Sequence, residues 1–228
     1  VHEAIDDDVA AIMVEVIQGE GGVIPIDEAF FQSLYQLCKE NNILLIIDEV
    51  QTGNGRTGYP FAYLKYQGIK PDIVTTAKGL GNGLPIGAMI ARDNLRESFG
   101  KGVHGSTFGG NPISLAASKA VLNQISDPEV LADIRHKAEW FMNGLRKATE
   151  GFPLIKEIRG DGFMIGIELK EEAAPYIKQI IDQQLLVLPA GPNVIRLLPP
   201  LTVSEEDLLL ALSIIKEVCK TTIPITKA

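Results

Sequence analysis

The first half of the chain alternates short apolar runs with a helix-like segment, and this alternation limits the possible folds more than any other feature. Residues 11–17 and 43–48 read as buried strands, and between them Asp27 can cap a helix whose apolar side chains recur with a period of ~3.6 residues. Further strands are expected at 72–77 and 86–91. Such alternation is typical of an α/β layer on a largely parallel sheet. Its chemistry should gather at the carboxyl ends of the strands.

The second half follows a different pattern. Helical patterns run from residue 111 to residue 150, broken once where Pro128 stops one helix and starts another. Beyond them come short strands and two helices, the last of which Ser204 can cap. The elements expected there are strands 155–159, 164–169, 185–188 and 194–198 and helices 173–184 and 204–220. We therefore expect part of a large domain (1–110), long connecting helices (111–150) and a small α+β domain (151–228).

Charge and composition exclude some classes of function. The formal net charge is −8, and Lys and Arg are scattered along the chain, which argues against a surface for nucleic acid or anionic membranes. No apolar run reaches the ~18–20 residues that span a bilayer. Small molecules or proteins are therefore the expected partners.

Two local features bear on the origin of the chain. Cys38 and Cys219 fall on apolar helix stripes, so we expect buried free thiols and a reduced, cytoplasmic protein. The start VHEAIDDD has neither a basic nor an apolar signal region and lacks an initiator Met. This start predicts a fragment or a processed chain.

Two charged residues end apolar strands. A carboxylate at Asp48 is costly unless it has a charged or hydrogen-bonding partner, such as a protonated ring nitrogen, although an aspartate here is more often a cap or turn former. Lys78 ends DIVTTAK and is followed by GLGNG, which lets backbone or ligand approach closely. A lysine at a dry strand end can act as a nucleophile and proton carrier, whereas a lone lysine is usually solvated. GLGNG fits neither a dinucleotide fingerprint nor a phosphate loop.

Four further residues are candidates for binding. Ser106 and Thr107 precede a helix start, in a segment that is either a phosphate cradle or an ordinary capping loop. Arg196 lies on a short strand, where a guanidinium can grip a carboxylate in bidentate fashion. Glu20 lies in a glycine-rich turn and is a possible partner for it. No metal site is expected.

Taken together, five segments resemble the ordered motif set of the class III (ornithine-type) aminotransferases. They are EVIQGEGG, IIDEVQTGNGRTG, PDIVTTAKGLGNGLPIGAM, HGSTFGGNP and VIRLLPPL. The resemblance implies a pyridoxal 5'-phosphate-dependent transferase of fold type I, represented here by part of its large domain and by the small C-terminal domain. RGDGFMIGIEL and LLVLPAGPNVIRLLPPL are most similar to members that act on N-acetylornithine.

The resemblance also implies roles at the cofactor ring. Asp48 would pair with the pyridinium nitrogen and keep it protonated, so that the ring accepts electrons. Val50 would lie against the ring, and Gln51 would hydrogen-bond its phenolic oxygen. Lys78 would form the Schiff base and then carry the proton between substrate and cofactor.

Further roles concern the phosphate and the substrate. Thr107, with Ser106, would bind the cofactor phosphate of a neighbouring subunit, because the family shares its active site across a homodimer. Arg196 would bind the α-carboxylate and pair with Glu20 when the α-amino group is not the one that reacts. The implied reaction is transamination between N-acetylornithine and 2-oxoglutarate in arginine biosynthesis. Ornithine or 4-aminobutyrate as donor, and a non-catalytic truncated fragment, are the alternatives.

The sequence departs from the family pattern in two ways. EVIQGEGG has Val16 where the family usually carries proline. No segment matches the family's upstream glycine-rich phosphate loop, its cofactor-stacking aromatic residue or its second substrate arginine. The chain is therefore expected to hold part of a cofactor site and to be poorly soluble or partly disordered alone, because sheet edges and apolar faces would be exposed.

Overall fold

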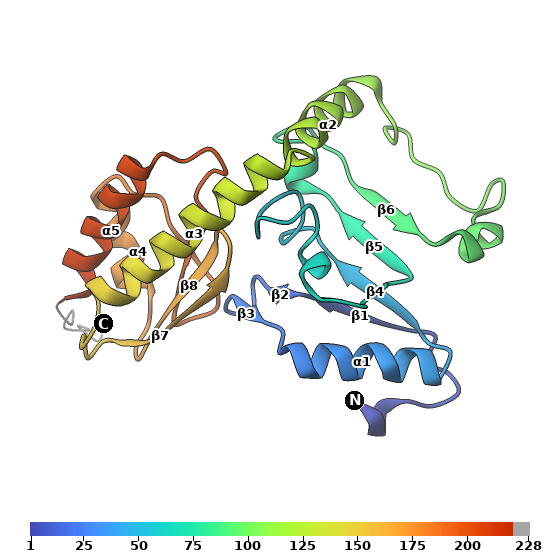
Figure 1. Ribbon diagram of the computed structural model, residues 1–228, viewed down its shortest axis with the longest axis horizontal. Coiled ribbons are helices and arrows are strands. Elements are labelled where there is room, and N and C mark those ends of the chain that lie inside the picture. Colours follow the sequence, from blue (N-terminus) through green and yellow to red (C-terminus); the bar gives the residue numbers. More distant parts are fainter. Residues whose placement is uncertain (221–228) are drawn as a thin grey trace. The chain divides into compact units, whose positions relative to one another are not determined.

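The computed structural model describes residues 1–220, apart from the side chain of His2, and its residues cluster into two compact units (Figure 1). Unit 1 comprises Val1–Val16, Ile26–Gly55 and Tyr59–Leu131. Unit 2 comprises Ile17–Pro25, Arg56–Gly58 and the described residues from Ala132 to Lys220. Two short segments from the first 60 residues thus belong to the unit that is otherwise built from the second half of the chain.

Unit 1 is built on a four-stranded sheet with the order β1-β4-β5-β6. Its strands are β1 (Ala11–Glu15), β4 (Leu44–Asp48), β5 (Ile73–Thr76) and β6 (Ala88–Ala91). The first three are parallel, and β6 runs antiparallel to β5. In the register, Asp48 pairs with Glu15 on one side and with Thr75 on the other. This mixed, mostly parallel sheet confirms the α/β fold class.

Helix α1 (Glu28–Glu40) packs on β4 and forms as the sequence predicts. Asp27 is its N-cap and accepts a hydrogen bond of 2.8 Å from the amide of Phe30. The apolar stripe supplies the buried face, Phe31, Leu34, Leu37 and Cys38. The spacing of these side chains therefore sets both the helix and the face it turns to the sheet.

The other helical elements of this half are mostly short. They are the 3₁₀ helices η1 (His2–Ala4), η2 (Ala62–Lys65), η3 (Lys78–Leu80) and η4 (Asp93–Phe99) and the α-helices α2 (Pro112–Ile125) and α3 (Pro128–Ala148). The N-cap of α2 is Asn111, which accepts from the amide of Ser114 at 2.9 Å, and Pro112 occupies the first helical position. Pro128 begins α3 as expected.

Unit 2 contains an antiparallel sheet with the order β7-β8-β10-β9, a two-stranded ribbon and helices. The elements are β2 (Ile17–Gln18), β3 (Ile24–Pro25), β7 (Ile155–Asp161), β8 (Met164–Leu169), α4 (Ala174–Asp182), β9 (Leu188–Pro189), β10 (Val194–Leu197) and α5 (Glu205–Cys219). Ser204 caps α5 and accepts from the amide of Asp207 at 3.0 Å. The most deeply buried side chains include Phe141, Phe163, Ile165, Ile167, Ile180 and Ile215.

Two strand predictions need correction. The run 11–17 is not one strand, because β1 ends at Glu15 and Ile17 starts β2, which pairs antiparallel with β3. The predicted strand 185–188 is also wrong, since only Leu188 lies in β9. Val187 is nevertheless buried, so its apolar character reflects packing of an irregular segment rather than a strand.

Both cysteines are free and buried, as predicted. Burial raises the pKa of the Cys219 thiol to about 12, and burial, followed by the charge of Asp72, raises that of Cys38. Such thiols are packing groups rather than nucleophiles. Between residues 1 and 220, no helix is both long enough and apolar enough to cross a bilayer.

Candidate active site

The carboxyl ends of β4 and β5 lie side by side, and Asp48 is the last residue of β4. Its Oδ1 accepts hydrogen bonds from the Val50 amide at 2.9 Å and from the Thr75 hydroxyl at 3.3 Å. The Thr75 contact places both side chains on the same face of the sheet. No described residue donates a hydrogen bond to Oδ2, so this half-buried carboxylate can still accept from a ligand.

Lys78 follows β5 by two residues, at the end of the strand next to that of Asp48. Its backbone is left-handed, with φ of 44°, and it begins η3. The side chain is exposed, so the prediction of a lysine at a dry strand end is wrong for this chain. The reason is local, because β5 ends at Thr76 and the turn of η3 carries residue 78 out of the sheet.

The remaining predicted cofactor residues lie in unit 1 on two segments. Val50 and Gln51 are half-buried in the turn that follows β4. Ser106 and Thr107 are exposed in the segment between η4 and α2. The Ser106 hydroxyl accepts a hydrogen bond from the Gly109 amide at 3.1 Å, which shapes the turn before α2. Within residues 1–220, neither hydroxyl hydrogen-bonds to Asp48.

In unit 2, Arg196 and Glu20 form the predicted ion pair. The distance from Arg196 Nη1 to Glu20 Oε1 is 2.7 Å. The Arg196 side chain is only 7% exposed, whereas that of Glu20 is 73% exposed. A fixed guanidinium on β10 therefore faces a carboxylate on a turn, and the turn is the part that solvent or a ligand can reach.

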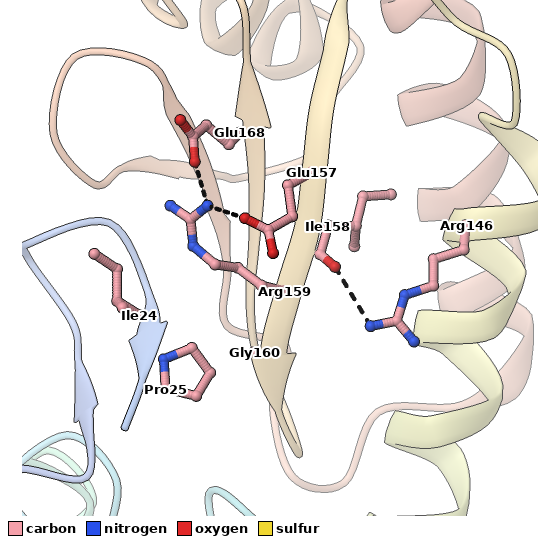
Figure 2. A pocket seen from close by; sticks show the side chains of 8 residues that line it. All are labelled: Ile24, Pro25, Arg146, Glu157, Ile158, Arg159, Gly160 and Glu168. Atoms are coloured by element: carbon pink, nitrogen blue, oxygen red, sulfur yellow. Dashed lines mark hydrogen bonds and ion pairs between the residues drawn. The ribbon is translucent and has the colours of Figure 1, made fainter. Parts of the chain in front are cut away.

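Arg159, which the sequence did not single out, fastens the turn that carries Glu20. Its guanidinium donates to the Gly22 carbonyl at 2.7 Å and to the Val23 carbonyl at 3.1 Å. It also pairs with Glu157 at 2.9 Å and with Glu168. The side chains of Arg159, Glu157 and Glu168 line a cavity of about 460 Å³, together with residues of β3 (Figure 2). Arg159 thus links the β7-β8 sheet to the turn.

The same turn is strained. Val23 has φ of 53° although its side chain is β-branched, and the residue is fully buried. A conformation of this kind persists only where the surroundings impose it. The hydrogen bonds from Arg159 to Gly22 and Val23 are part of that constraint. No sequence pattern predicts the contact, because 136 positions separate Arg159 from Val23.

A buried carboxylate, Glu49, follows Asp48 directly and was also missed. Its Oε2 accepts from the Thr52 hydroxyl at 2.5 Å, and Oε1 accepts from the Tyr63 amide at 2.8 Å. Burial raises the pKa of Glu49 above its usual value, against the effect of these hydrogen bonds. Glu49 therefore ties the turn after β4 to the start of η2.

Comparison with protein families settles the assignment that the fold and these motifs suggest. The model of the family "Aminotransferase class-III" matches residues 1–219. The chain belongs to the class III aminotransferases. It is 54% identical over 217 residues to acetylornithine aminotransferase from Bacillus cereus, covering 95% of this chain and 56% of that protein. The Bacillus subtilis enzyme of the same name is 48% identical over 210 residues, covering 92% and 54%.

Solved structures of other members of the class give the same result. N-acetylornithine aminotransferase from Stenotrophomonas maltophilia has a TM-score of 0.83 and 36% identity, covering 92% of this chain and 56% of that one. Ornithine aminotransferase from Toxoplasma gondii, whose crystals show partial occupancy of PLP at the active site, has a TM-score of 0.86 and 33% identity, covering 92% and 51%. The chain thus spans about half the length of the class III relatives it matches. Among the side chains that the structure describes, no group of His, Cys, Asp and Glu could hold a metal ion.

Proposed function

We propose that this chain contributes the lysine and aspartate part of a pyridoxal 5'-phosphate site in an aminotransferase that moves an amino group between N-acetylornithine and 2-oxoglutarate, a reaction of arginine biosynthesis. The observation that carries the proposal is the adjacency of the β4 and β5 ends, where Asp48 and Lys78 lie. The names of the similar acetylornithine aminotransferases support the choice of substrate.

The residues present fit this cofactor. Asp48 keeps Oδ2 available for a ring N–H, while its Oδ1 is fixed by Val50 and Thr75. Val50 and Gln51 follow within the same turn and are half-buried, so they can contact the ring and its phenolic oxygen. When bound, the cofactor supplies an electron sink for the carbon that carries the reacting amine.

Lys78 has two tasks in this proposal. It would hold the cofactor covalently through its amine until the substrate amine displaces it. The freed amine would then carry a proton from the substrate carbon that bears the reacting amine to the cofactor carbon that receives the amino group. Asp48 keeps the ring nitrogen protonated, because a carboxylate beside that nitrogen favours its charged form. Both roles depend on the two strand ends staying side by side.

Arg196 and Glu20 sort the two substrates. The guanidinium is buried on β10 and already paired, so a substrate carboxylate must displace Glu20 to reach it. An α-keto acid can do this through a bidentate contact. While Glu20 stays paired with Arg196, the carboxylate balances the charge of the guanidinium. A substrate can then present its terminal amine instead of its α-amino group.

The proposal includes a homodimer in the cytoplasm. Ser106 and Thr107 are exposed in a segment just before α2, as is required of hydroxyls that bind the cofactor phosphate of a partner subunit. The peptide amides of this segment can serve the same anion.

Covalent trapping tests the cofactor site. The purified chain is mixed with pyridoxal phosphate, reduced with borohydride and mapped by mass spectrometry. We expect an adduct at Lys78 that Lys78→Ala removes and Lys178→Ala, a change at an exposed lysine of α4, leaves in place. Labelling spread equally over exposed lysines would reject a specific site.

Substrate choice needs a separate assay of the enzyme of which these residues form part. A panel of N-acetylornithine, ornithine and 4-aminobutyrate, each with 2-oxoglutarate, should show fastest turnover with the first amine. Faster turnover of ornithine or 4-aminobutyrate would reject the substrate proposed.

The second candidate function is a folded, non-catalytic fragment of such an enzyme. The exposure of Lys78 favours it, because a solvated lysine gains nothing from its surroundings. A chain that stays folded, by circular dichroism, yet forms no adduct at Lys78 would support this alternative.

A further inference from the structure

Asn54 joins the two strand ends that carry the proposed site. It lies six residues after Asp48, is 5% exposed and belongs to unit 1. Its side-chain amide donates to the Thr76 hydroxyl at 3.0 Å and to the Ala77 carbonyl at 3.2 Å. Both donor hydrogens of the amide are therefore used on the last residue of β5 and the residue after it.

The bond to Ala77 acts directly on Lys78. The Ala77 carbonyl and the Lys78 amide nitrogen are parts of one planar peptide, so fixing the carbonyl fixes the bond about which φ of Lys78 turns. That φ is 44°, a left-handed value that a non-glycine residue holds only under constraint. The Ala77 carbonyl also accepts from the Leu80 amide at 2.9 Å, which closes η3.

Asparagine is well suited to this position. Asn54 itself has φ of 56°, a region that asparagine tolerates better than most residues. The backbone N–H of Asn54 donates to the Pro60 carbonyl at 2.8 Å, which anchors the backbone of the loop. A Cβ added at Gly79 would lie 3.3 Å from the Asn54 Cβ, so the turn after Lys78 packs closely on this side chain.

We propose that Asn54 is a positioning residue that holds the Ala77–Lys78 peptide in its left-handed turn and thereby sets the direction of the Lys78 amine. The inference rests on the proposed role of Lys78 as the cofactor-binding lysine. Asn54 acts through the backbone of Lys78 and takes no part in proton transfer.

Two substitutions at this position separate the contributions. Asn54→Gly keeps the left-handed backbone without strain and removes the amide. Asn54→Asp keeps the shape but turns an oxygen, which cannot donate, toward the Ala77 carbonyl. The matched control is Asn42→Gly, because Asn42 has φ of 54° but is exposed at the end of α1. Because both variants replace asparagine by glycine, they raise the entropy of the unfolded chain by the same amount.

The first measurement needs no cofactor. Hydrogen exchange of the amides at 78–81 should be about tenfold faster in both Asn54 variants, as expected for the loss of two hydrogen bonds, and unchanged in the control. The second is the pyridoxal phosphate concentration that gives half-maximal borohydride-trapped adduct at Lys78. It should rise about tenfold in both Asn54 variants and stay unchanged in Asn42→Gly.

The outcomes distinguish this inference from the proposed function. Unchanged half-saturation in the Asn54 variants, with or without faster exchange, overturns a positioning role for Asn54 while the cofactor site stands. If exchange and half-saturation change in Asn54→Gly but keep the parent's values in Asn54→Asp, the amide donors have no role. A parent chain without adduct at Lys78 overturns the proposed function itself, and the positioning role with it.

Discussion

Replacing Glu49 by alanine should destabilise unit 1 strongly, because the side chain is fully buried and accepts from three donors. The donors are the Thr52 hydroxyl and the amides of Tyr63 and Ala62. A buried donor left without an acceptor costs about 1–3 kcal/mol. Since Tyr63 is only half-buried, water can partly replace its contact, and we expect a total loss of about 3–5 kcal/mol.

Glu49→Gln is the matched variant. The amide oxygen can still accept from Tyr63, and the amide nitrogen can donate to the Thr52 hydroxyl, so the expected loss is about 1 kcal/mol or less. The assay is urea unfolding followed by far-UV circular dichroism, with hydrogen exchange over 44–52 to assign the change to unit 1. Equal losses in the two variants would refute the hydrogen-bond explanation and leave only a volume effect.

The same pair of proteins tests the pH dependence. Burial raises the pKa of Glu49, so the folded chain keeps the proton to a higher pH than the unfolded chain does. The stabilisation of the neutral carboxyl is therefore complete below the unfolded pKa and is lost as the pH rises through the folded pKa. The unfolding free energy of the parent, relative to Glu49→Gln, should therefore fall as the pH rises above the ordinary glutamate pKa of 4.5. A difference that grows with pH would contradict the assigned direction.

Two further changes probe unit 2. In a thermal melt, Gly160→Ala should lower the unfolding free energy of unit 2 by about 3 kcal/mol or more, because the new Cβ would lie 2.1 Å from a carbonyl oxygen of β8 at a φ of 135°. Gly151→Ala is the control: its φ is 78° but open space surrounds it, so the change should cost about 1 kcal/mol in the same melt. Arg159→Met should cost about 2–3 kcal/mol and speed hydrogen exchange at Gly22, since it leaves the Gly22 and Val23 carbonyls and Glu157 without this donor, whereas Glu168 keeps its pair with Lys156. Unchanged exchange at Gly22 would reject the role of Arg159 in holding the turn.

Local signals predicted most of the fold. Asp27 and Ser204 mark their helices because an N-cap is decided within one turn. The apolar runs before Asp48 and Lys78 mark strands because one face of each strand is buried and the other is partly covered. The run at 185–188 misled because apolar character does not ensure burial: only Val187 is buried, whereas Leu186 and Leu188 are exposed.

The candidate site was predicted less completely. Arg196 and Glu20 were paired through the family motifs, and the structure has the ion pair. Glu49 and Asn54 were missed because their partners come from η2 and β5, and only the tertiary fold brings those segments to the turn after β4. Exposure of Lys78 was missed because a strand-end lysine reads the same whether or not other atoms cover it.

The interleaving of the two units has a consequence for synthesis on the ribosome. The four described strands of the unit 1 sheet have been made once Ala91 is added, but Glu20 cannot meet Arg196 until 176 more residues follow it. At the usual elongation rates this interval is about 10–35 s. During that time the ribbon of β2 and β3 has been made, but the sheet of β7, β8, β10 and β9 has not. The Arg196–Glu20 pair, which is proposed to sort substrates, therefore forms late in synthesis. Cutting the gene between the two halves would leave neither product with both members of the pair.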